Sequence, residues 1–151
     1  MANFTNDIGE VANPYTAHIL ISEFRKFIFL NQMNIKTLSD KQDMKPYLLY
    51  NDKKNYKGTD KAFKGLTAPP LIDIVWRCII KYEKVYFDFC FNVLGVFLDR
   101  SEPYSSNSSV STDYTRTLEL LENYQSTLNP CFTLWPKISP TQLEYEYDNT
   151  Y

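Results

Sequence analysis

The stretch that decides the fold is 69-PPLIDIVWRCIIKYEKVYFDFC-90, near the middle of a chain of 151 residues. Its proline pair suits the first turn of a helix, where a missing N–H leaves no intrahelical hydrogen bond unmade. Asp73 falls in that turn, where a carboxylate complements the helix dipole. Apolar residues then recur at helical spacing. We expect two helices with a bend around 81–84 and an end near Gly95.

The run 17-AHILISEFRKFIFLNQM-33 predicts an earlier helix with a wide apolar face. Phe24 and Phe27 lie on that face, and Glu23 is expected at the surface. Thr16 is the expected N-cap, because its hydroxyl can accept a hydrogen bond from a backbone N–H of the first turn. The helix is expected to fade within 31–34.

The segment 34–66 has no clear periodicity and predicts a long basic connection. Ser39 and Asp40 suggest the start of a short helix that Lys45-Pro46 would end, because the residue before a proline disfavours helical geometry. The run 47-YLLY-50 suits either a strand or a short helix. The polar run 51–61 is expected to form a loop.

The run 113–128 predicts a last helix, which begins after a serine-rich loop and stops at Asn129-Pro130. The remainder carries two prolines and no helical period. We therefore expect an extended C-terminal arm from which Phe132, Leu134 and Trp135 return to the core.

These elements predict one all-α domain, a small bundle of three or four helices around an aromatic-rich core. The expected organisation is an N-terminal arm at 1–16, a helical domain at 17–136 and a C-terminal tail at 137–151. Only four glycines occur, so no P-loop or dinucleotide-binding turn is expected.

The charge and cysteine content narrow the function classes. The net charge of −2 disfavours a protein that coats nucleic acid or an anionic membrane. The three cysteines have no metal-binding spacing and predict reduced thiols, hence an intracellular, reducing compartment. No signal peptide, mitochondrial transit peptide or membrane span is expected. The cytoplasm, or a cytoplasmic structure such as the cytoskeleton or a cilium, fits this composition.

The central motif resembles the glycine-rich-domain-containing-protein-like family, a helical domain. The resemblance covers about 17–136 and is carried by seven residues: Pro70, Asp73, Trp76, Tyr86, Cys90, Gly95 and, near the end, Trp135. The family motif has histidines after the tryptophan and after the glycine. This chain has Arg77 and Ile79 at the first place, and Asp99 and Arg100 at the second. Arginine neither ligates a metal nor accepts a proton, so the resemblance implies a degenerate member whose polar site has lost its function.

The leading hypothesis is therefore a non-enzymatic accessory subunit, without cofactor, that contacts other subunits of a larger assembly. Aromatic residues and arginines dominate such contacts, and loop lysines come second. The expected contact residues are Arg77, Tyr145, Tyr147, Lys53, Lys54 and Lys57. Arg77 could instead pair with Asp73 four residues earlier on the helix.

Two alternatives stay open. The first is a metal- or small-molecule-binding site rearranged from Asp73, Cys78, Asp99 and His18, the single histidine of the chain. The second is RNA binding through 36–64, where eight lysines and four aspartates give a local charge of +4 with aromatic residues between them. A solvated basic loop is the simpler interpretation of that stretch.

Overall fold

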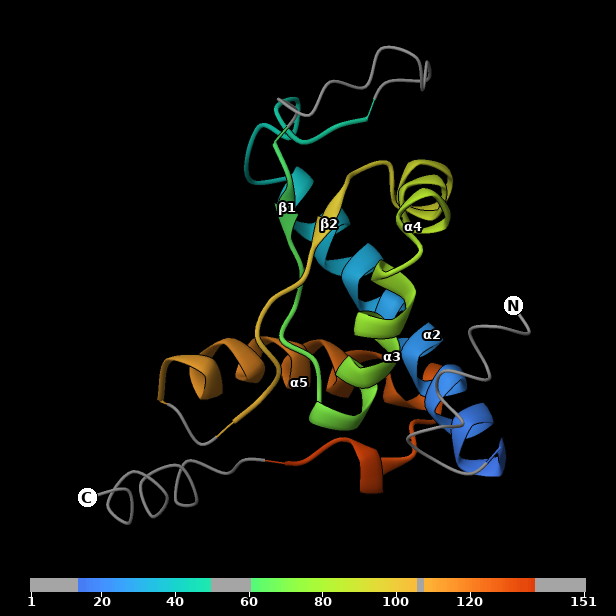
Figure 1. Cartoon of the computed structure of the whole chain (residues 1–151). Helices are drawn as coiled ribbons and strands as arrows, with labels where there is room; N and C mark the ends of the chain where they lie inside the picture. Colours follow the sequence, from blue (N-terminus) through green and yellow to red (C-terminus); the bar gives the residue numbers. More distant parts are fainter. Residues whose placement is uncertain (1–13, 50–60, 106–107, 138–151) are drawn as a thin grey trace.

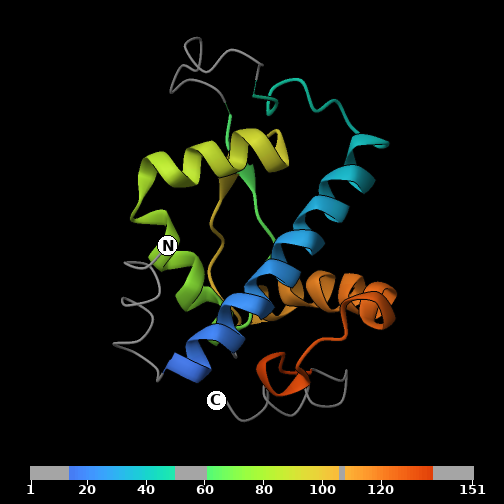
Figure 2. The same cartoon turned by 90° about the vertical axis from the view of Figure 1, so that its right-hand side faces the viewer.

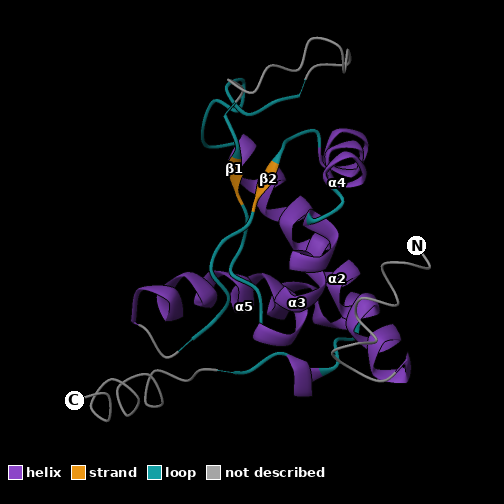
Figure 3. Ribbon diagram, viewed as in Figure 1, coloured by secondary structure: helices purple, strands orange, loops and turns teal. Residues whose placement is uncertain are grey.

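The computed structural model describes residues 14–49, 61–105 and 108–137. Within these ranges the chain is mostly helical, as expected, and it adds one short sheet that the sequence did not predict (Figure 3). The elements in chain order are α2 (Pro14–Ser39), β1 (Phe63–Lys64), α3 (Pro70–Ile80), α4 (Glu83–Phe89), the π-helix η2 (Cys90–Leu94), β2 (Leu98–Asp99), α5 (Ser108–Leu128) and the 3-10 turn η3 (Phe132–Leu134).

Helix α2 runs diagonally across the molecule and packs against α3 on one side and α5 on the other (Figure 2). It is longer at both ends than the predicted helix. Thr16 lies inside it and is not the N-cap, and no separate helix opens at Ser39, where α2 itself ends. The prediction of a surface position for Glu23 was also wrong, because this side chain is 1% exposed.

The bend after Ile80 was predicted correctly. Tyr82 leaves the helical region with φ −94° and ψ 73°, so that α3 ends and α4 begins at Glu83. The helix then widens into η2, whose last bond runs from the Gly95 N–H to the Cys90 carbonyl over 2.8 Å. Gly95 has φ +72°, a left-handed conformation that glycine adopts without steric cost.

The two strands pair in parallel, with Phe63 opposite Leu98 and Lys64 opposite Asp99. They descend in front of α2 toward α5 (Figure 1). Of the 47–50 run, Leu48 forms an isolated antiparallel bridge with Val96, which bears out the strand-like alternative at that residue. The 51–60 part of the predicted loop lies outside the described residues.

Helix α5 begins at Ser108, inside the stretch expected to be a loop, and ends at Leu128 as predicted. Asn129 follows with φ 48°, the left-handed residue that commonly terminates helices. Trp135 returns to the core and is fully buried, but Phe132 is 43% exposed, contrary to expectation. No helix in the described ranges is long and apolar enough to cross a bilayer.

Candidate functional site

The polar residues of the central motif meet around Asp73, in the first turn of α3. Its carboxylate is fully buried and accepts two hydrogen bonds from Arg100: Nε lies 2.7 Å from Oδ1, and Nη2 lies 2.6 Å from Oδ2. Arg77 adds a third contact, with Nε 3.2 Å from Oδ2. Burying a carboxylate is costly unless the charge is paired. The two arginines therefore supply the opposite charge that burial of the Asp73 carboxylate requires.

The two arginines differ in exposure. The Arg100 side chain is 29% exposed, and its hydrogen bonds to Asp73 raise the pKa of its guanidinium above the usual value. The Arg77 side chain is 58% exposed, although one edge is held by Asp73. Both interpretations of Arg77 from the sequence, a surface residue and a partner of Asp73, therefore hold. Two guanidinium groups against one carboxylate leave a local surplus of positive charge.

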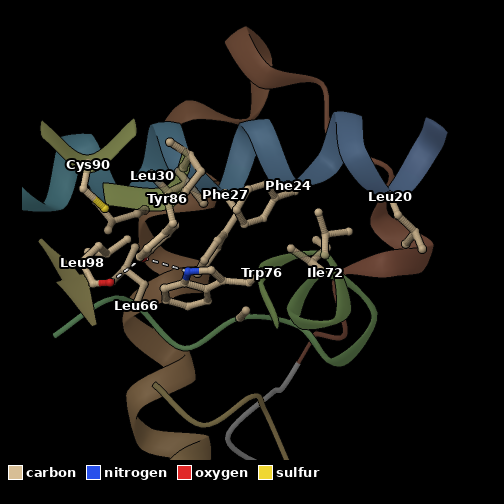
Figure 4. Packing of buried hydrophobic residues seen from close by; sticks show 14 of the residues in the cluster. Leu20, Phe24, Phe27, Leu30, Leu66, Ile72, Trp76, Tyr86, Cys90 and Leu98 are labelled. Carbon is tan, nitrogen blue, oxygen red and sulfur yellow. Dashed lines mark hydrogen bonds between the residues drawn. The ribbon is translucent and has the colours of Figure 1, made fainter. Parts of the chain in front are cut away.

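Other residues of the motif form a second, uncharged network (Figure 4). The Trp76 Nε1–H donates to the Tyr86 hydroxyl over 3.1 Å, and the Tyr86 hydroxyl donates to the Leu98 carbonyl. Burial raises the pKa of the Tyr86 phenol and also that of the Cys90 thiol. Both groups are thus neutral at physiological pH, and neither is prepared to act as a base or a nucleophile.

Five of the seven motif residues of the family resemblance lie in the core. Asp73, Trp76, Tyr86, Cys90 and Trp135 are all buried. The remaining two shape helix ends: Pro70 is the first residue of α3, and Gly95 ends η2. The spacing of the motif identified these residues in the sequence. It did not indicate the hydrogen bonds between Asp73 and Arg100, which are 27 positions apart.

The four residues of the rearranged metal site do not form one. Asp73 is engaged by arginines and Cys78 is buried in α3, whereas Asp99 is exposed on β2 and His18 is exposed on α2. In the described part of the chain, no three His, Cys, Asp or Glu side chains lie close enough together to hold a metal ion.

The basic stretch is only partly described. Five of its lysines are exposed at the surface: Lys36, Lys41, Lys45, Lys61 and Lys64. Its described aromatic rings are used within the fold. Phe63 is buried, and Tyr47 packs edge-on against it with ring centroids 5.3 Å apart. The Lys61 Nζ covers the Tyr47 ring at 5.1 Å. These two rings are therefore not free to stack on nucleic-acid bases.

Five of the expected contact residues, Lys53, Lys54, Lys57, Tyr145 and Tyr147, lie outside the described residues. Sequence reasoning also missed Thr67 and Glu102, which line a surface hollow together with Asp99 and Lys64. No periodicity or motif marks these positions.

Comparison of the chain with protein-family models, with curated proteins and with solved structures gives no match. The family resemblance therefore stays a prediction.

Proposed function

We propose that this chain is a non-enzymatic accessory subunit that works through contacts with other proteins. The observation that carries the proposal is the state of Asp73: the buried carboxylate of the motif is bound by Arg100 and Arg77 and is not available for chemistry. The neighbouring Tyr86 is likewise committed to Trp76 and Leu98. The polar groups of the motif thus hold the fold together.

Arg77 is the contact residue that the geometry supports best. Its guanidinium is held at one edge by Asp73, while more than half of the side chain is open to solvent. Such an arginine loses less conformational freedom when a partner binds than an unrestrained one.

The same proposal includes the family and the compartment. A divergent member of the glycine-rich-domain-containing-protein-like family would keep the buried motif while its histidine positions are occupied by other residues. A reducing intracellular compartment agrees with Cys78, Cys90 and Cys131, none of which forms a disulfide within the described chain.

The test is gentle purification of the untagged chain from its native source, with measurement of the apparent mass and identification of co-purifying chains. We expect a species far above 17.8 kDa with defined partners. The variant Arg77→Met should lose partner chains, whereas Lys36→Met, which removes an exposed cation at the end of α2, should retain them. A lone monomer of 17.8 kDa would contradict the proposal.

A further inference from the structure

The chain after α5 forms a short strap, residues 130–137, that returns toward α2 and runs beside α5 (Figure 2). Asn129, with its left-handed φ of 48°, makes the turn into the strap. Of the strap residues only Pro130 and Trp135 are buried, and Phe132 is 43% exposed. A segment with so little buried surface belongs to the low-stability end of a fold.

Three hydrogen bonds tie the strap and its turn to the two helices. They run from the Cys131 N–H to the Glu23 carboxylate, from the Lys26 ammonium to the Asn129 carbonyl over 3.0 Å, and from the Tyr114 hydroxyl to the Pro136 carbonyl over 2.9 Å. The closed position of the strap therefore depends on a few polar contacts and on the burial of one large side chain, Trp135.

The packing between the strap and α5 is incomplete. A hollow of about 360 Å³ lies between them, lined by Leu118 and Leu121 of α5 and by Phe132 and Lys137 of the strap. The Lys137 Nζ lies 4.4 Å from the centre of the Phe132 ring, which is a contact within the strap itself. Phe132 thus adds little to the burial that keeps the strap closed.

The seam between the strap and α2 also contains unsatisfied polar groups. Within the described ranges, only Glu23 Oε2 and Trp135 Nε1 are buried side-chain polar atoms without a hydrogen-bond partner. Glu23 Oε2 has an ion pair with Lys26 at 3.1 Å, and the Trp135 ring packs against Phe27 with centroids 6.4 Å apart. Buried donors and acceptors normally have partners, and leaving one unpaired costs stability. Contact with water would satisfy both atoms, which lowers the cost of opening this seam.

We propose that the strap is a conformational device: residues 130–137 detach from α2 and α5 about Asn129 while the helical core stays folded. Detachment returns the Trp135 Nε1–H and the Glu23 carboxylate to water. It also exposes the Trp135 ring and the face of Phe27 that this ring covers. The detached form thus presents an aromatic surface that the closed form hides. This inference goes beyond the proposed function, because it holds whether or not a partner binds.

The test compares hydrogen exchange at the two tryptophan indoles of the full chain by nuclear magnetic resonance. Both side chains are 0% exposed, but the Trp76 Nε1–H donates to Tyr86 over 3.1 Å in the core, whereas Trp135 belongs to the strap. The Trp135 indole should exchange at least about a hundredfold faster than the Trp76 indole. Added urea should change its rate little, because detachment exposes little surface, and should raise the Trp76 rate steeply. The Cys131 amide should report the same opening equilibrium as the Trp135 indole.

Three variants separate local detachment from global unfolding. Leu98 is fully buried beside Tyr86, near Leu30 (Figure 4), so Leu98→Ala should destabilise the closed and detached forms equally. It should accelerate exchange at Trp76 about tenfold or more and leave Trp135 unchanged. Lys26→Met removes contacts of the closed form alone and should accelerate both indoles by the same factor. Lys36→Met, which removes an exposed cation at the end of α2, is the matched control and should change neither rate.

Equal exchange of the two indoles in the unmodified chain, with equal dependence on urea, would overturn the inference, and this comparison needs no variant. Acceleration of both indoles by the same factor in Leu98→Ala would overturn it too. A fast Trp135 indole beside a slow Cys131 amide would also count against it, because water would then reach the ring without detachment. Fast exchange of both groups that neither urea nor Leu98→Ala alters would establish the detachable strap.

Discussion

At the scale of single residues, Asp73 shows how a charged side chain can stabilise a helical core. A buried carboxylate costs several kcal/mol unless opposite charges surround it. Arg100 approaches it with two parallel hydrogen bonds, the strongest geometry between these groups. Arg77 makes a single contact from the exposed face of the same helix.

This difference predicts unequal effects of removing the two arginines. Arg100→Met should lower the free energy of unfolding by about 3 kcal/mol, because it leaves most of the charge of a buried carboxylate uncompensated. Arg77→Met should cost less than about 1 kcal/mol, as expected for an exposed pair within a helix. Urea denaturation followed by circular dichroism measures both values. Equal losses for the two variants would show that Arg77 carries as much of the pairing as Arg100.

At the scale of elements, the packing of the segment after β1 against α3 depends on a residue without a side chain. A Cβ atom at Gly65 would lie 2.6 Å from Trp76 Cη2 and 3.0 Å from the Asp99 carbonyl oxygen. Gly95 presents the opposite case, because its surroundings are open and only its φ of +72° requires glycine. One glycine thus permits close packing, and the other permits a helix to end.

The two glycines should therefore respond differently to substitution. Gly65→Ala should destabilise the protein by about 1–3 kcal/mol through overpacking, and Gly65→Asn by more. Gly95→Ala should cost about 1–2 kcal/mol through backbone strain, and Gly95→Asn should cost less than that, since asparagine tolerates this conformation. Thermal and urea unfolding of the four variants supply the comparison. If asparagine is better tolerated than alanine at both positions, packing against Trp76 is not the constraint at Gly65.

Several element boundaries were predictable because the signals for them are local. The break between α3 and α4 and the end of α5 at Asn129-Pro130 follow from spacing and from residues that disfavour helix. The ends of α2 and the start of α5 were not predictable. Helix α2 continues to Ser39, with Ile35 and Leu38 packed against the core and Asn34 buried in that extension. Burial against other elements overrides local preference there.

At the scale of the whole molecule, one buried side chain joins the two ends of the described chain. Glu23 in α2 accepts a hydrogen bond from the Cys131 N–H and pairs with Lys26 at 3.1 Å. The Lys26 ammonium in turn donates to the Asn129 carbonyl over 3.0 Å. This cluster holds the segment after α5 against α2 and leads into the turn that buries Trp135.

Loss of this connection should loosen the C-terminal part of the fold. Glu23→Ala should lower the free energy of unfolding by about 2–3 kcal/mol, since it removes a buried, charged acceptor from the half-buried Cys131 N–H, and Glu23→Gln should lower it less. Hydrogen exchange at the Cys131 amide should accelerate in both variants. Glu122→Ala, on the exposed face of α5, is the matched control. Unchanged protection of the Cys131 amide in Glu23→Ala would contradict this role.

The sequence by itself determined the helical class, the bend within 69–90 and the stop after Leu128, because each depends on residues that are neighbours along the chain. The tertiary structure alone decided the β1–β2 pair, the burial of Glu23 and the pairing of Asp73 with Arg100. Those partners are separated by 108 positions for Glu23 and Cys131 and by 27 positions for Asp73 and Arg100. Local periodicity does not indicate which distant group will pair with a buried charge, because this pairing forms only when the helices pack together.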